Sequence, residues 1–182
     1  MAVDSVPESQ GRSALMALIP EAEGLVKSFR DRFDPSAAKG VPAHITILFP
    51  FKPPLELTPV VDEVLRGLFS ASPSFKVSLS RLGRFPDALY LSPEPEEPFH
   101  RLTRLVTERF PEHEPYEGEF AQNIPHLTIA QLPEPDHLDE ITVDFQRAAH
   151  GRLPIRATVD EVALMDNTTG LWQVRSRFRL GA

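Results

Sequence analysis

Two short apolar segments, each beginning with a histidine that is followed two residues later by a threonine, constrain this chain more than any other feature. One contains His44 and Thr46, the other His126 and Thr128, and they begin almost half a chain length apart. Both segments have the composition of strands, in which successive side chains point to opposite faces. Each strand should therefore present an imidazole and a hydroxyl on one face and an apolar surface on the other.

The elements predicted around these strands follow the same order in both halves of the chain. Apolar periodicity and proline breaks predict, in the first half, a strand at 13–19, a helix at 21–33, the histidine strand at 44–49, a helix at 58–71 and a strand at 75–82. The second half gives a strand at 88–91, a helix at 98–110, the histidine strand at 125–130, a weaker helix at 136–149, and a hairpin from 155–165 and 171–180. Because the residues themselves differ between the halves, this indicates a duplicated architecture, not a sequence repeat.

We therefore predict an α+β fold of two pseudo-symmetric lobes. Each lobe should be a mainly antiparallel sheet backed by helices, with the two histidine strands lining a central cleft. Residues 1–182 are expected to form one bilobal domain, with halves at roughly 12–85 and 86–182 and terminal strands that can cross between lobes. We expect a monomer.

Composition excludes several classes of protein. The chain contains no cysteine, so disulfides, thiolate metal sites and cysteine nucleophiles are impossible. Its apolar runs are too short to cross a bilayer, and its first dozen residues are polar, without a signal-peptide pattern. We expect a soluble cytoplasmic protein with no membrane partner.

The formal net charge of −7 argues against binding to long nucleic acid, because such proteins usually neutralise phosphates with a basic surface. A phosphate site in this chain would have to be local. Two imidazoles with ordinary pKa values near 6.5 can divide into one base and one acid at neutral pH. They could act on opposite sides of a phosphate while Thr46 and Thr128 hold its non-bridging oxygens. A zinc site is the weaker alternative, because two histidines form an incomplete ligand set. We expect no metal and no cofactor.

The stretches HITILFPFKPP at 44–54, IPHLTIAQL at 124–132 and LWQVRSRFRLG at 171–181 resemble the two-histidine phosphoesterase superfamily. The likeness is to its 2′-5′ RNA ligase-like and cyclic phosphodiesterase branch, and it covers nearly the whole chain. The resemblance implies two lobes around a cleft, with His44 and His126 catalytic and Thr46 and Thr128 binding phosphate. It also implies hydrolysis of cyclic phosphodiesters and, in some members, reversible 2′-5′ ligation of RNA ends.

One position departs from the family pattern. Bacterial RNA ligase-like relatives commonly carry an arginine where this chain has Gln131, and the loss of that charge favours a small substrate. We therefore expect hydrolysis of a small cyclic nucleotide or an RNA-terminal 2′,3′-cyclic phosphate. The alternatives are a 2′-5′ RNA ligase acting on RNA ends, a non-catalytic module that binds nucleotides or RNA ends, and two purely structural histidines.

Aromatic residues near the motifs are candidates for stacking on a base. Phe51 is the preferred candidate because it directly follows the first histidine strand, and Gln131 is a second possible substrate contact. Phe85, Tyr90 and Trp172 are more simply explained as packing residues.

Overall fold

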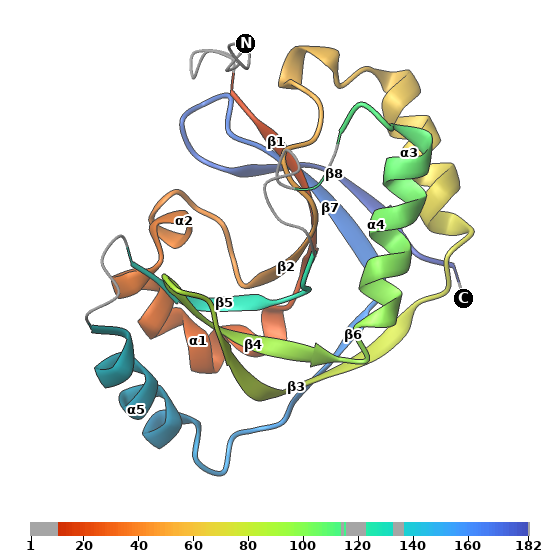
Figure 1. Cartoon of the computed structure of the whole chain (residues 1–182). Helices are drawn as coiled ribbons and strands as arrows, with labels where there is room; N and C mark the ends of the chain where they lie inside the picture. The colour runs from red at the N-terminus through yellow and green to blue at the C-terminus, as the bar shows by residue number, and fades with distance from the viewer. Residues whose placement is uncertain (1–10, 114, 116–122, 133–136, 182) are drawn as a thin grey trace.

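The computed structural model describes residues 11–113, 115, 123–132 and 137–181, which form two four-stranded antiparallel sheets (Figure 1). The first sheet has the order β2 (His44–Leu48), β1 (Ser13–Leu18), β7 (Glu161–Asp166), β8 (Gln173–Arg179). The second has the order β5 (Leu127–Gln131), β4 (Ala88–Glu94), β3 (Phe75–Arg84), β6 (Ile155–Val159). The predicted α+β architecture of two antiparallel sheets backed by helices is confirmed.

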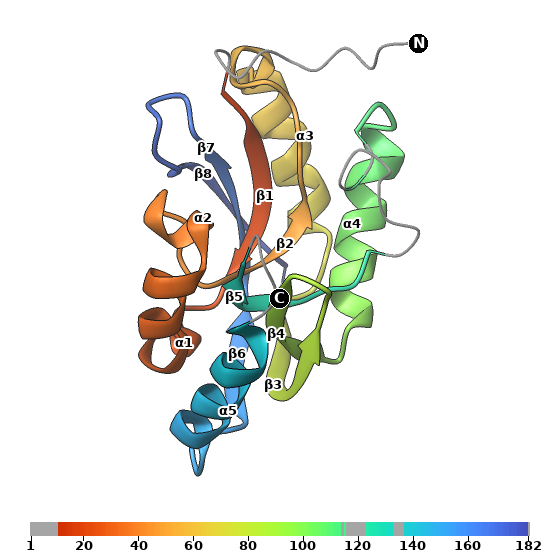
Figure 2. The ribbon, with the colours of Figure 1, turned by 60° about the vertical axis from the view of Figure 1, so that its left-hand side comes forward.

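Two of the longer helices pack on each sheet. The longer ones are α1 (Pro20–Phe33), α3 (Pro59–Ser70), α4 (Glu97–Arg109) and α5 (Leu138–Ala149), and two short turns are α2 (Pro35–Ala38) and the 3₁₀ helix η2 (Pro54–Glu56). α3 packs on β8 and α4 on β2, whereas α1 packs on β5 and β6 and α5 on β4 (Figure 2). Thus α1 follows β1 of the first sheet in the chain but covers the second sheet. This packing joins the two sheets into one structural unit.

The strands also cross between the sheets. β3 pairs with β4 and β6 in the second sheet, while β7 and β8 return from the end of the chain to pair with β1 in the first. A boundary near residue 85 therefore does not separate the strands of one sheet from those of the other.

The predicted strand at 155–165 is wrong as a single element. It consists of β6 and β7, which lie in different sheets and are separated by Asp160. The apolar and β-branched composition of this stretch indicates strand propensity along its whole length. Composition carries no information on where a strand leaves one sheet and enters another.

The start of α3 is set by two neighbouring residues. Thr58 caps α3 by accepting a hydrogen bond from the Val61 N–H at 3.4 Å, and Pro59 occupies the first helical position. In α1, Phe29 packs edge-on against Phe145 of α5 with ring centroids 5.2 Å apart. No helix in the described ranges is long and apolar enough to cross a membrane.

The larger of two apolar clusters among the described residues contains side chains from both sheets and fixes which side chains face away from it. Ile45 and Ile47 of β2 and Leu127 and Ile129 of β5 are fully buried in this core. Burying side chains of this size stabilises a fold by about 1.5–3 kcal/mol each. Because side chains alternate along a strand, this burial turns the intervening histidines and threonines to the opposite face.

Candidate active site

The two histidine strands meet at the junction of the sheets. β2 and β5 are each the outermost strand of their sheet, and the two strands are in contact with one another (Figure 1). His44 and Thr46 on β2 are half-buried, as are His126 on the residue before β5 and Thr128 within it. The structure therefore brings together the four residues that the sequence singles out.

Both imidazoles are oriented in the same way by the backbone. His44 Nδ1 lies 2.8 Å from the carbonyl oxygen of Pro42, and His126 Nδ1 lies 2.7 Å from that of Ile124. A carbonyl oxygen can only accept, so Nδ1 carries the proton in both rings. In the neutral imidazole this leaves Nε2 with a free lone pair. Each ring is thus held in the tautomer that can accept a proton at Nε2.

Thr46 and Thr128 occupy equivalent places beside these rings. Thr46 is paired with Met16 of β1, and Thr128 with Tyr90 of β4. Within the described part of the chain neither threonine hydroxyl hydrogen-bonds another protein group. Both hydroxyls therefore have their donor available for a ligand.

Electrostatics makes both histidines less basic than usual. Burial, followed by the positive charge of Arg30, lowers the pKa of His44 from 6.5 to about 4. A charge on His126 also lowers it, so the two rings are close enough to interact. Burial lowers the pKa of His126 as well, against the opposing effect of the Ile124 carbonyl. Without a bound anion, both imidazoles are neutral at neutral pH.

His126 is additionally packed by two aromatic rings. Phe85 meets it edge-on at 5.0 Å between centroids, and Tyr90 lies 5.4 Å away. Phe85 and Tyr90 also stack on each other at 4.4 Å. Gly83, which pairs with Tyr90 across the strands, makes room for this ring, since a Cβ there would lie 2.3 Å from Tyr90 ring atoms. The glycine is therefore part of the support of His126.

Gly83→Ala should lower both stability and turnover. The added methyl must displace the buried Tyr90 ring, and overpacking of this kind typically costs about 1–3 kcal/mol. Because that ring contacts His126, the imidazole should move with it. Denaturant unfolding and kcat measure the two effects. Gly67→Ala in α3 is the matched control, because nothing lies within 4 Å of its Cβ position. Wild-type stability and turnover in Gly83→Ala would contradict this role.

The two expected substrate contacts differ in exposure. Phe51 is 3% exposed and packs against Phe110 and His113, which leaves little of its ring accessible to a base. Gln131 ends β5, is exposed, and donates to Asp87 at 3.3 Å. Trp172 packs against Phe49, consistent with a structural role.

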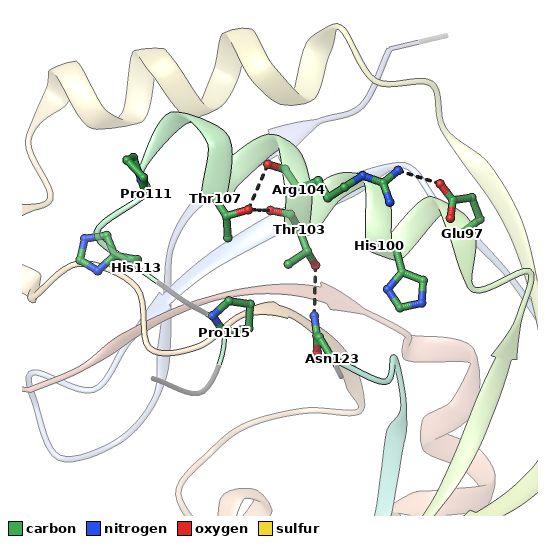
Figure 3. A pocket seen from close by; sticks show the side chains of 9 residues that line it. All are labelled: Glu97, His100, Thr103, Arg104, Thr107, Pro111, His113, Pro115 and Asn123. Atoms are coloured by element: carbon green, nitrogen blue, oxygen red, sulfur yellow. Dashed lines mark hydrogen bonds and ion pairs between the residues drawn. The ribbon is translucent and has the colours of Figure 1, made fainter. Parts of the chain in front are cut away.

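A cavity of about 570 Å³ lies along α4 and contains neither motif histidine. Figure 3 shows its lining: Glu97, His100, Thr103, Arg104, Thr107, Pro111, His113, Pro115 and Asn123. Its polar groups are largely occupied by one another, as in the Arg104–Glu97 ion pair at 2.8 Å and the Asn123–Thr103 contact at 3.4 Å. No cluster of three or more potential metal ligands occurs among the described residues.

Comparison of the chain with known proteins identifies its family. The family model described as the 2′-5′ RNA ligase superfamily matches residues 19–171, which include both histidine strands. The chain belongs to this superfamily. Among curated proteins it is 31% identical over 161 residues to a Bacillus cytotoxicus protein provisionally named a phosphoesterase, covering 84% of this chain and 86% of that protein. A Geobacillus kaustophilus protein with the same provisional name is 26% identical over 169 residues, covering 87% and 90%.

Solved structures share the fold of this superfamily member. TT0787 of Thermus thermophilus superimposes with a TM-score of 0.62 at 21% identity, covering 93% of this chain and 97% of that one. LigT of Escherichia coli, solved with 3′-AMP, gives a TM-score of 0.59 at 17% identity, covering 95% and 99%. These likenesses confirm the two-lobe architecture.

Proposed function

We propose that this protein is a phosphodiesterase that opens 2′,3′-cyclic phosphates of nucleotides or RNA ends by two-histidine acid–base catalysis, without a metal. The observation that carries the proposal is the arrangement of β2 and β5. These adjacent edge strands each present an imidazole locked with Nε2 free and a threonine hydroxyl without a protein partner among the described residues.

The proposed step uses each of these groups once. One neutral imidazole takes a proton from water through Nε2 as the water oxygen bonds to phosphorus. The bond from phosphorus to one ribose oxygen breaks, and that oxygen receives a proton from Nε2 of the other imidazole. Thr46 and Thr128 donate to the non-bridging oxygens, where negative charge increases. Because His44 has the pKa of about 4, we assign it as the base and His126 as the acid.

The substrate class follows from charge and from the relatives. A net charge of −7 disfavours long RNA and leaves a local phosphate site as the means of binding. LigT has been solved with 3′-AMP, NADP⁺ and ATP, which supports a small nucleotide as ligand. The superfamily match favours one second candidate, 2′-5′ RNA ligation, in which a 5′-hydroxyl would replace the attacking water.

A substrate panel separates these functions. The protein is incubated with 2′,3′-cyclic mononucleotides, an ADP-ribose cyclic phosphate, a 2′-5′-linked dinucleotide, and RNA halves that end in a cyclic phosphate and a 5′-hydroxyl. Our proposal expects ring opening to a monophosphate. Joined RNA halves in place of a terminal monophosphate would show a ligase, and saturable binding without turnover would show a binding module.

The pH dependence should be displaced toward acid. With one imidazole required neutral and the other protonated, kcat/KM is expected to rise through a limb near pH 4, from His44, and to fall before neutrality as His126 loses its proton. Bound phosphate raises the pKa of both rings, so the kcat profile should lie at higher pH than the kcat/KM profile. Initial rates from pH 3.5 to 9 measure both profiles. An acidic limb of kcat/KM near pH 6.5 would contradict the environment described for His44.

A further inference from the structure

The three residues before His44 are tied to helix α1. Arg30 Nη2 donates to the carbonyl oxygen of Val41 at 3.0 Å, and the Ala43 N–H donates to Glu23 Oε1 at 2.6 Å. The carbonyl between these two attachments is that of Pro42, which accepts from His44 Nδ1 at 2.8 Å. The group that orients the imidazole is therefore bracketed by two side chains from one helix.

Arg30 is itself held inside the protein. It is 2% exposed, and its Nε donates to Asp34 at 2.9 Å while Nη2 also reaches Ser36 Oγ at 3.2 Å. Asp34 in turn accepts from the Ser36 N–H at 2.9 Å. A buried ion pair contributes little net stability compared with apolar side chains of the same volume, because both charges lose their hydration. Stability alone therefore does not account for this pair.

We propose that Glu23 and Arg30 are positioning residues that hold the segment Val41–Ala43, and through the Pro42 carbonyl fix the orientation of the His44 imidazole. The effect of these two residues on activity rests on the proposed function. Their effect on the orientation and the pKa of His44 does not depend on that function.

The network also affects the charge of His44. After burial, the Arg30 guanidinium is the largest cause of the lowered pKa, while Asp34 acts in the opposite sense and more weakly. His126, on the facing strand, lowers the pKa further. Removing Arg30 and Asp34 together should therefore raise the pKa of His44 from about 4 toward its usual 6.5. Removing an ion pair that does not interact with His44 would leave the pKa of His44 unchanged.

The first test replaces the buried pair by apolar residues, Arg30→Met/Asp34→Leu. Its matched control is Lys27→Met/Asp31→Leu, which removes an exposed pair of the same spacing within α1, 2.8 Å between Nζ and Oδ2. We expect kcat on a 2′,3′-cyclic nucleotide to fall by about 10–10²-fold in the first variant, with little change in KM, because small displacements of a catalytic group are costly. An NMR titration should show the higher pKa of His44 in that variant only.

The second test uses Glu23, whose replacement leaves the buried pair intact. Glu23→Ala removes the acceptor of the Ala43 N–H and should lower kcat, whereas Glu23→Gln keeps an accepting oxygen and should restore most of it. If the Arg30→Met/Asp34→Leu variant does not fold, the comparison of Glu23→Ala with Glu23→Gln still tests whether α1 positions His44. Thermal unfolding monitors the fold of each variant.

The outcomes separate this inference from the proposed function. A wild-type protein that turns over no cyclic phosphate would overturn the proposed function, while the His44 titrations would still test the inference. An unchanged pKa of His44 in the apolar pair, or equal activity of Glu23→Ala and Glu23→Gln, would overturn the inference even with full phosphodiesterase activity.

Discussion

Replacing either His44 or His126 by alanine should reduce turnover of a 2′,3′-cyclic nucleotide by about 10²–10⁴-fold, the usual contribution of a general acid or base. Both proteins should remain folded, because both imidazoles are half-buried on the face that points away from the core. The strands are anchored by neighbours on the other face, such as the fully buried Ile45 and Leu127. Initial rates with the cyclic substrate, together with circular dichroism and thermal unfolding, measure the two effects.

His137→Ala is the matched control for these variants. His137 lies at the start of α5, its side chain is 73% exposed, and its nearest charged partner is Glu140 at 3.7 Å. Its loss should leave turnover unchanged. Full activity in either motif variant, or global unfolding of both, would return the two histidines to a structural role.

Thr46→Val and Thr128→Val should each slow turnover by about 10²-fold. Valine keeps the β-branched shape that suits a strand but deletes the hydroxyl, and loss of one donor to developing negative charge costs on that order. The threonines do not titrate, so the pH optimum should stay where it is in the wild-type protein. Rates across the pH range with each variant measure both the height and the position of the profile.

Combining the two valine substitutions refines this expectation. If both hydroxyls hold the same phosphate, the double variant should lose less than the product of the single losses. Thr142→Val in α5 is a control, since its hydroxyl donates within the helix to Leu138 at 2.6 Å. A Thr46→Val or Thr128→Val protein at the wild-type rate would show that the hydroxyl is not used.

The faces of the strands could be predicted from sequence because alternation is a local rule. His44 and Thr46 follow from the burial of Ile45 and Ile47, and the same reasoning holds on β5. The start of α3 was equally local, since Thr58 and Pro59 carry the capping signal within two residues. These features depend on neighbours in the chain, and they were predicted correctly.

Features that depend on contacts with residues far away in the chain could not be predicted from local sequence patterns. The division of residues 155–165 between two sheets depends on pairing with β3 and β1, which lie far earlier in the chain. Phe51 follows a histidine strand, yet Phe110 and His113 enclose it. Such contacts join residues that lie far apart in the chain, so the neighbouring residues do not specify them.

Two residues that support the motif histidines were not predicted from the sequence, although each lies in a recognisable local pattern. Gly83 directly follows the strand predicted at 75–82 and lies inside β3 in the structure; a glycine in a strand often marks the close approach of another group, here Tyr90. Arg30 follows Val26 by four residues on the buried face of α1 and precedes Asp34 by four, a charged pair continuing an apolar stripe. Neither pattern identifies the histidine that it supports, because that relation is made through space.

The two supports differ, and this gives the histidines different properties within a symmetric arrangement. His126 is packed by Phe85 and Tyr90, whereas His44 is influenced by the buried Arg30 charge. Burial and the Arg30 charge lower the pKa of His44 to about 4, whereas burial is the cause that lowers the pKa of His126, and groups in different environments are suited to divide the roles of base and acid. The pseudo-symmetry of the lobes therefore does not require equivalent chemistry at the two strands.

The central claim is that both imidazoles act on one phosphate in one step, and the rate of the double variant His44→Ala/His126→Ala tests it most directly. Groups that act as a unit show strongly non-additive losses. With a 2′,3′-cyclic nucleotide as substrate, we predict that the double variant is no slower than the slower of the two single variants. A double variant slower by the full product of the two single losses would show that the histidines act independently, and would contradict this account.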